Sequence, residues 1–218
     1  MDWNVIARNL GFMAGGLVLT FQLAALAIGG GLLLGILLGL CRVSSVSWIY
    51  YPSTAYVHFF RSQPLILVIF WFYFLVPILV GRPLGAFPST VVAFICFEAA
   101  YFAEIVRGGL QSVSRGQTMA AYACGLRYSQ VQLHVVIPQA LRNMVPALTT
   151  QAVVIFQDTS LAYVIGLREF LRRVNLVDTR EVRSVELYCF AGLVYLVLCS
   201  MGSILARRLE QRRGAAPA

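Results

Sequence analysis

The chain has 218 residues, of which 59% are hydrophobic and 12% charged, and its mean hydropathy is +0.77. A soluble domain carries about twice that share of charge, so the composition indicates an integral membrane protein with several spanning helices and no separate aqueous domain. The net charge of +8 comes from 17 basic residues, all of them Arg, and the absence of Lys excludes both a Walker phosphate-binding loop and Lys Schiff-base chemistry.

Long apolar runs separate the Arg residues, which therefore do not form the single basic face that binds nucleic acid. Nucleic acid is not an expected partner, and we interpret the basic excess as a signal for orientation in a membrane. The five Cys form no Cys-x-x-Cys pair, and the two His, His58 and His134, are far apart. We expect neither a metal site nor a disulfide framework.

The first apolar run has 33 uncharged residues between Arg8 and Arg42. It is too long for the apolar core of a secretory signal peptide, and we expect it to span the membrane. Gly31, Gly35 and Gly39 recur every four residues within it and share one helix face. This face allows another helix to approach closely, either within the subunit or in a second subunit.

Four further apolar runs follow, and a span needs about 20 residues to cross the hydrocarbon. The sequence thus predicts an all-α integral membrane protein, a single transmembrane domain over residues 1–218. The five predicted transmembrane helices cover approximately residues 11–41, 53–79, 87–107, 143–167 and 186–207. Pro64 predicts a kink in the second of them.

Three acidic residues fall within the predicted spans. Each would cost a few kcal/mol if charged at the bilayer centre, so each is expected to face protein or water. Glu104 precedes Arg107 by three residues, and either pairs with it or has a role in transport. Glu98 and Asp158 are nearer the middle of their spans and are expected to line a polar path, or to be kept neutral by burial.

The distribution of Arg predicts the orientation. With the C-terminus in the cytoplasm, ten Arg lie on the cytoplasmic side and seven outside, and the stretch from Arg107 to Arg142 contains no acid. The N-terminus is therefore predicted to be periplasmic and the C-terminus cytoplasmic. Trp3, Trp48 and Tyr50 fall at predicted membrane interfaces.

Residues 108–142 are too polar to span a membrane and too many for a tight turn. The segment GQTMAAYACGLRYSQ predicts a short helix that ends at Gly125, and a second short element precedes Pro138. Outward-facing small residues such as Ala120 and Ala121 could fit a groove on a soluble partner. The alternative is an ordinary amphipathic helix at the membrane surface.

This loop resembles the signature of permease subunits in binding-protein-dependent ABC importers, E-A-A-x-x-x-G, nine residues, then I-x-L-P. Met119, Ala120, Ala121 and Gly125 keep that spacing, and nine residues later the chain continues with Val-Val-Ile-Pro, ending at Pro138. The resemblance implies the type I importer fold, with residues 108–142 as the cytoplasmic coupling loop.

The resemblance covers nearly the whole chain and narrows to permeases of polar amino acids. FFRSQPLILVIFWFYF is similar to an Arg-Gly-Thr-Pro segment, with Ser62 and Gln63 as substitutions, and FQDTSLAYVIGL is similar to a Lys-Asp-Thr-Ser-Leu segment. Together with FEAAYFAEIVRGG, these segments are most similar to glutamate/aspartate permeases. Glutamine, histidine and arginine remain alternative substrates.

Two departures from the family pattern change local charge. Met119 replaces the signature Glu, so docking of the ATPase must use the shape of Ala120, Ala121 and Gly125, with Arg115 or Arg127 as a source of charge. Gln157 replaces Lys and removes a positive charge beside Asp158. The expected coupling residues are Gly116, Gln117, Met119, Ala120, Ala121, Gly125 and Pro138.

The expected translocation or gating residues are Arg61, Pro64, Glu98, Glu104, Gln157, Asp158, Thr159 and Ser160. Arg172 and Arg173, in the outer loop, are expected to contact the binding protein. Other predicted partners are a second permease subunit, identical or homologous, a cytoplasmic ATPase dimer that carries ATP and Mg, and the lipid of a bacterial inner membrane. This chain is expected to carry no cofactor.

Two other classes of function compete with transport. A membrane anchor would recruit a soluble partner through residues 108–142 without moving solute, and would tolerate apolar residues in place of both Glu98 and Asp158. An intramembrane enzyme would need a nucleophile or a metal cluster, and the sequence offers no recognisable motif of either kind.

Overall fold

The computed structural model describes the backbone of residues 2–214, with side chains described through Ala206 and at Arg208. This part of the chain is helical, without strands. Its α-helices are α1 (Asn4–Cys41), α2 (Ser47–Arg61), α3 (Leu65–Phe70), α4 (Val76–Val80), α5 (Ala86–Gln111), α6 (Arg115–Ala123), α7 (Tyr128–Val131), α8 (Ile137–Asp158), α9 (Phe170–Glu181) and α10 (Ser184–Gly214). Two π-helical turns, η1 (Trp71–Leu75) and η2 (Gln132–Val136), and one 3-10 helix, η3 (Thr159–Ile165), complete the set.

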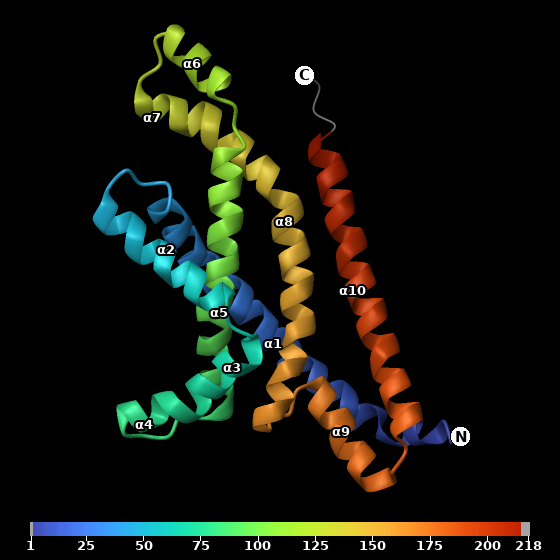
Figure 1. The fold of residues 1–218 in the computed structure, drawn as a ribbon. Coiled ribbons are helices and arrows are strands. Elements are labelled where there is room, and N and C mark those ends of the chain that lie inside the picture. The colour runs from blue at the N-terminus through green and yellow to red at the C-terminus, as the bar shows by residue number, and fades with distance from the viewer. Residues whose placement is uncertain (1, 215–218) are drawn as a thin grey trace.

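Figure 1 shows the α6–α7 hairpin at one end of the molecule, with α9 and the start of α1 at the other end. Among the described residues, three helices are long and apolar enough to cross a membrane: Asn4–Cys41, Ala86–Gln111 and Ser184–Ala206. The pair Ser47–Arg61 and Leu65–Val80 would make a fourth span, bent by 104°. The architecture is thus that of a multi-spanning helical protein, while the five-span count stays a prediction.

The glycine face of α1 packs against α5 within the subunit. A Cβ atom at Gly39 would lie 2.7 Å from the Cβ of Val106, and one at Gly35 would collide with the Cβ of Phe102. Neither clash can be relieved by a flexible side-chain end, because backbone carbonyls of α5 lie beside both positions. The first of the two predicted uses of the glycines, packing inside the subunit, is therefore confirmed.

The break between α2 and α3 lies where Pro64 predicts a kink. α2 ends at Arg61, and Pro64 is the N-cap of α3 with an extended ψ of 135°. Proline has no N–H to donate to the preceding turn and disfavours helical geometry in the residue before it, which explains why one continuous helix does not form. The predicted span 53–79 is therefore two helical segments that meet at a sharp angle.

The predicted helix 143–167 differs from the structure at both ends. α8 begins at Ile137, with Pro138 in its first turn, and gives way after Asp158 to the 3-10 helix η3. The Thr159 hydroxyl donates a hydrogen bond of 2.6 Å to the Phe156 carbonyl, and Gly166, with φ +79°, ends η3. Side chain to backbone bonds of this kind compete with regular α-helical pairing.

Candidate functional site

The α6–α7 hairpin turns sharply at Gly125. Its φ of +81° is left-handed, a conformation that costs an L residue about 1–2 kcal/mol. The Gly125 N–H donates to the Tyr122 carbonyl at 2.9 Å, and the Leu126 N–H donates to the Ala121 carbonyl at 3.2 Å. This pair of bonds is a Schellman motif, which satisfies the last carbonyls of α6.

The tip of the hairpin exposes Met119 and Ala120 but not Ala121. The Met119 side chain is 69% exposed, whereas Ala121 is buried and clusters with Val131 and Val136. The prediction that Ala121 faces a partner was wrong, because its methyl group fills the small core between α6 and η2. Ala121 thus shapes the hairpin from inside.

The hairpin is tied to the neighbouring helices by side-chain amides. Gln139 of α8 donates to the Gln117 side-chain carbonyl at 3.1 Å, and Asn143 donates to the Ser112 hydroxyl at 2.7 Å. These bonds connect α8 with α6 and with the end of α5. The hairpin is therefore bonded to α8, the helix that also carries Gln157.

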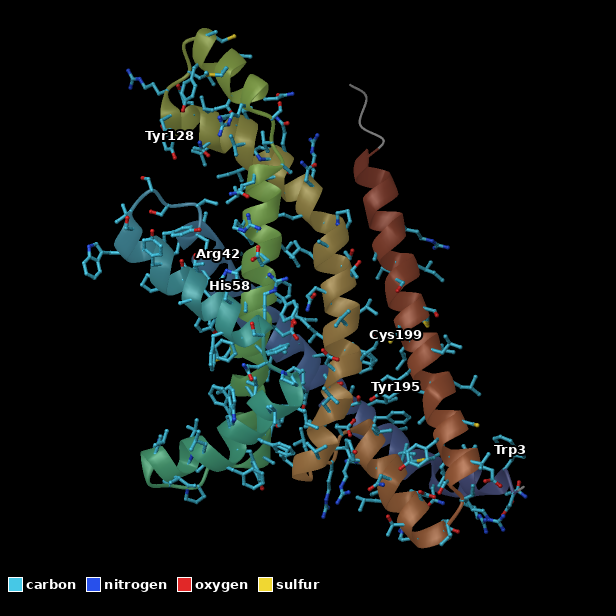
Figure 2. The ribbon with its side chains drawn as sticks, viewed as in Figure 1. Trp3, Arg42, His58, Tyr128, Tyr195 and Cys199 are labelled. Atoms are coloured by element: carbon cyan, nitrogen blue, oxygen red, sulfur yellow. The ribbon has the colours of Figure 1, made fainter. Side chains whose placement is uncertain are left out.

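A cleft with both polar and apolar lining residues lies between α8 and α10. Two adjoining hollows, of about 660 and 270 Å³, share Gln157, Gly192 and Tyr195 as lining residues. Ser160 lines the hollow nearer α9, and Ser200 and Ser203 line the other (their neighbours Tyr195 and Cys199 are labelled in Figure 2). Because polar groups at membrane depth must face protein or water, this cleft is the candidate translocation surface.

The other side of the α8–α10 pair has a different character. There a hollow of about 400 Å³ is lined by α1, α8 and α10, mainly with apolar side chains such as Phe21, Ile28, Phe156 and Leu198. An apolar hollow suits packing or lipid tails, not an amino acid. Of the hollows beside α8 and α10, the one that Gln157, Ser200 and Ser203 line has more polar lining than this one.

Glu98 does not line the cleft. It is fully buried in α5, where its Oε2 accepts a hydrogen bond of 2.7 Å from the side-chain amide of Gln151, and its Oε1 has no hydrogen-bond partner among the described residues. Its Cβ faces Gly31 of α1. Glu98 therefore lies between helices, and the expectation that it lines a polar path does not fit this position.

The other predicted path residues are divided between exposed and buried positions. Gln157 is exposed on α8, and Asp158 and Ser160 are half-buried. Thr159 is fully buried and bonded to its own backbone, so it supports the end of α8 instead of facing the cleft. Sequence reasoning missed Gln151, although an amide within an apolar run was a visible signal for a buried polar contact.

Glu104 is the centre of an ion-pair cluster. Its carboxylate lies 2.6 Å from Arg42, which directly follows α1, 3.0 Å from Arg61 of α2 and 2.7 Å from Arg107 of α5. The predicted pairing with Arg107 is confirmed, and the structure adds the two other Arg. Arg61, which we expected on the translocation path, lies instead in this cluster, with its guanidinium over the ring of Tyr101.

At the opposite end of the molecule, Arg173 fastens α9 to α1. Its Nη1 donates to the Phe12 carbonyl at 2.8 Å, and its guanidinium lies 5.2 Å from the centre of the Phe12 ring. Arg172 instead donates to Asn175 within α9 at 2.8 Å. Arg173 thus holds α9 against α1, a structural role that we did not predict. Its contact with a binding protein stays a prediction.

The first turn of α9 is capped by a buried carboxylate. Glu169 accepts hydrogen bonds from the backbone N–H groups of Leu171 and Arg172, at 2.8 and 2.6 Å. Burial raises the pKa of Glu169 to about 7, although both N–H groups favour its ionised form. The cap fixes where α9 begins after η3, and with it the end of the cleft that Leu171 of α9 helps to line.

Comparison with known families accounts for this arrangement. Residues 31–214 match the family described as binding-protein-dependent transport system inner membrane component. The chain belongs to this family. It is an inner-membrane, multi-pass permease component of an amino-acid ABC importer, and the ATPase is a different component of such a transporter. Permease subunits of this family carry no cofactor, and their transport depends on a binding protein and an ATPase.

Individual relatives agree with this assignment. The chain is 42% identical to the glutamate/aspartate import permease protein GltK of Escherichia coli, over 97% of each chain. It is 32% identical to the probable glutamine ABC transporter permease protein GlnM of Bacillus subtilis, over 97% of this chain and 98% of the relative. A crystal structure of an amino acid ABC transporter with histidines is 29% identical, with a TM-score of 0.92 over 97% of this chain and 99% of that one.

The fold extends to a more distant permease. The methionine ABC transporter MetNI, in an inward-facing conformation, matches with a TM-score of 0.71 at 19% identity, over 97% of this chain. At that identity the likeness concerns the fold alone.

Proposed function

We propose that this permease imports acidic amino acids, glutamate and aspartate, with the α8–α10 cleft as its part of the translocation path. The observation that carries the substrate class is 42% identity to a glutamate/aspartate permease over 97% of both chains. The five Arg of the outer loop favour an anionic substrate: Arg168, Arg172, Arg173, Arg180 and Arg183.

The proposed topology has five spans, with the N-terminus periplasmic and the C-terminus cytoplasmic. α1, α5 and α10 would supply three spans, the bent α2–α4 segment a fourth, and α8 with η3 a fifth. α8 is more polar than the others because it carries residues such as Gln151 and Gln157. A span of that composition is stable where its polar face meets protein or water.

The buried position of Glu98 removes one difficulty for an anionic substrate. A carboxylate in the cleft would repel a dicarboxylate, but Glu98 is covered and bonded to Gln151. The Gln157 amide and the Ser160 hydroxyl are both neutral groups, and each can donate and accept hydrogen bonds. We infer that these two side chains meet the substrate's polar groups in the cleft.

Coupling to ATP would act through the hairpin. We propose that the ATPase contacts exposed Met119 and Ala120, with Arg115 and Arg127 as exposed charges nearby. A partner groove for Met119 would be apolar, because a thioether cannot form the ion pair of a Glu. A second permease subunit would complete the path, and binding of substrate, binding protein and ATP would differ between two global states.

The test is uptake and substrate-stimulated ATP hydrolysis by the reconstituted transporter, assembled with its own partner chains, across a panel of amino acids. We expect glutamate and aspartate to stimulate both activities and glutamine, histidine and arginine to stimulate neither. Gln157→Ala should lower uptake about tenfold, as loss of one or two hydrogen bonds in a desolvated site would. Gln22→Ala is the control, the same substitution on an exposed position of α1 outside the cleft.

Stimulation by a neutral or basic amino acid alone would reject the proposed substrate. Equal uptake by the Gln157→Ala and Gln22→Ala variants would reject the hypothesis that the cleft is part of the translocation path. If the chain assembled stably with the ATPase but the transporter took up none of the substrates tested, the result would favour the membrane-anchor hypothesis.

A further inference from the structure

The ion-pair cluster at Glu104 carries more positive charge than its carboxylate can neutralise. Three guanidiniums, those of Arg42, Arg61 and Arg107, lie within 3.0 Å of one carboxylate. Both oxygens are used, Oε1 by Arg42 and Arg61 and Oε2 by Arg107. Within the described chain no other carboxylate pairs with these three Arg, so two positive charges remain.

The deepest of the three Arg is incompletely satisfied. The Arg42 side chain is only 7% exposed, and its Nε has no hydrogen-bond partner among the described residues. A buried N–H of a charged group without an acceptor is costly, which indicates that a further acceptor belongs at this position. Arg61 and Arg107 are 41% and 32% exposed, so the cluster is open from outside.

The residues around the cluster are of the kinds found where lipid tails meet headgroups. Arg42 directly follows α1, whose last turns expose Leu33, Leu37 and Leu40. Trp48, 91% exposed, begins the next helix only a few residues later. Exposed leucines followed by Arg and Trp are typical of a membrane interface. Figure 2 shows Arg42 beside α5, on the side of the molecule away from α10.

We infer that the Arg42–Arg61–Arg107 cluster binds the phosphate headgroup of an anionic phospholipid, in the leaflet on the side of the α6–α7 hairpin. The headgroup phosphate would supply the missing acceptors and the balancing negative charge. A soluble phosphate offers the same acceptors, and the experiment below distinguishes the two sources. This inference depends on the location of the family in a membrane, and it does not depend on which amino acid is transported.

The binding free energy is shared among the guanidiniums. An Arg near an anionic membrane surface strengthens binding by a factor of about five. Arg61→Gln should therefore lower the amount of phosphatidylglycerol that stays with the purified transporter about fivefold. Arg61→Lys keeps the charge and should retain most of the lipid. Arg208→Gln is the matched control, because Arg208 is an exposed Arg of α10 that forms no ion pair in the described structure.

Glu104→Gln separates lipid binding from the integrity of the cluster. This variant breaks the Arg61–Glu104 ion pair, as Arg61→Gln does, together with the other two pairs of Glu104, but it raises the net charge of the cluster. We expect it to retain as much phosphatidylglycerol as the wild type, or more. If ion-pair integrity alone mattered, Glu104→Gln and Arg61→Gln would both lose lipid.

The experiment uses the complete transporter, washed in detergent or reconstituted in phosphatidylcholine vesicles with and without phosphatidylglycerol. Bound lipid is counted by mass spectrometry. Greater loss in Arg61→Gln than in Arg208→Gln, with retention in Arg61→Lys, supports the site, and this comparison stands even where Glu104→Gln fails to assemble. Equal retention in Arg61→Gln and Arg208→Gln would overturn it. Displacement of the lipid by inorganic phosphate at millimolar concentration would reject a lipid source.

Discussion

The absence of a Cβ atom at Gly35 allows α1 and α5 to approach each other closely. At Gly35 there is no room for a Cβ, since Phe102 and the Ala99 carbonyl already fill that space. Overpacking of a tight core costs about 1–3 kcal/mol, which exceeds the gain of roughly 1 kcal/mol from the better helix propensity of Ala. Close packing therefore outweighs local preference at this position.

Gly35→Ala should accordingly lower the midpoint of thermal unfolding of the purified transporter, by a destabilisation of about 1–2 kcal/mol. Gly29→Ala is the control, because nothing lies within 4 Å of a Cβ built on Gly29. It should leave the midpoint unchanged or raise it slightly. Equal midpoints for the two variants would show that α1 can shift to accommodate the methyl group.

At the scale of elements, the hairpin depends on the left-handed turn that ends α6. Gly125→Leu should strain this turn by about 1–2 kcal/mol and displace α7, while the apolar spans still insert. We expect ATP hydrolysis to continue and uptake per ATP to fall severalfold. The measurement is the ratio of substrate transported to ATP hydrolysed in proteoliposomes.

Gly108→Leu provides the matched control for this prediction. Gly108 lies in α5 near the same hairpin, nothing lies within 4 Å of a Cβ built there, and its φ is not positive. The same side chain is thus added at an exposed site without backbone strain. An unchanged coupling ratio in Gly125→Leu, or an equal fall in both variants, would contradict the role of the turn.

Periodicity and local chemistry predict some elements well. The long apolar runs give α1, α5 and α10, and Pro64 marks the break after α2. The end of α8 at Asp158 could not be predicted in this way, because the apolar run continues through η3 and the change depends on local backbone bonding at Thr159. The π-helical turn at Trp71–Leu75 has no signal in the apolar pattern.

At the scale of the whole molecule, contacts between segments that are far apart in the sequence could not be predicted. The sequence offers the pair Glu104 and Arg107, three residues apart, but not Arg42 and Arg61, which come from other parts of the chain. Likewise, Gln157 was predicted as a path residue from resemblance, whereas its neighbours on α10, such as Tyr195, became visible only in the fold. The residue types can be read from the sequence, but the packing of the helices determines which side chains contact one another.

The orientation of the whole chain can be tested with its own cysteines. Cys124 is exposed at the end of α6, and Val182, 81% exposed, lies at the opposite end between α9 and α10. With the other cysteines replaced by Ser, a membrane-impermeant maleimide should label Cys124 only in inside-out vesicles. A Val182→Cys variant that lacks Cys124 should be labelled only in right-side-out vesicles.

These opposite results are expected because, in the proposed topology, α8 with η3 is the one span between the hairpin and the α9–α10 turn. Addition of the ATPase should also protect Cys124 from the reagent, because the hairpin would then be covered. Labelling of both positions from the same side would mean that α8 does not cross the membrane. Labelling of Cys124 from outside would place the hairpin away from the ATPase and would refute coupling through Met119.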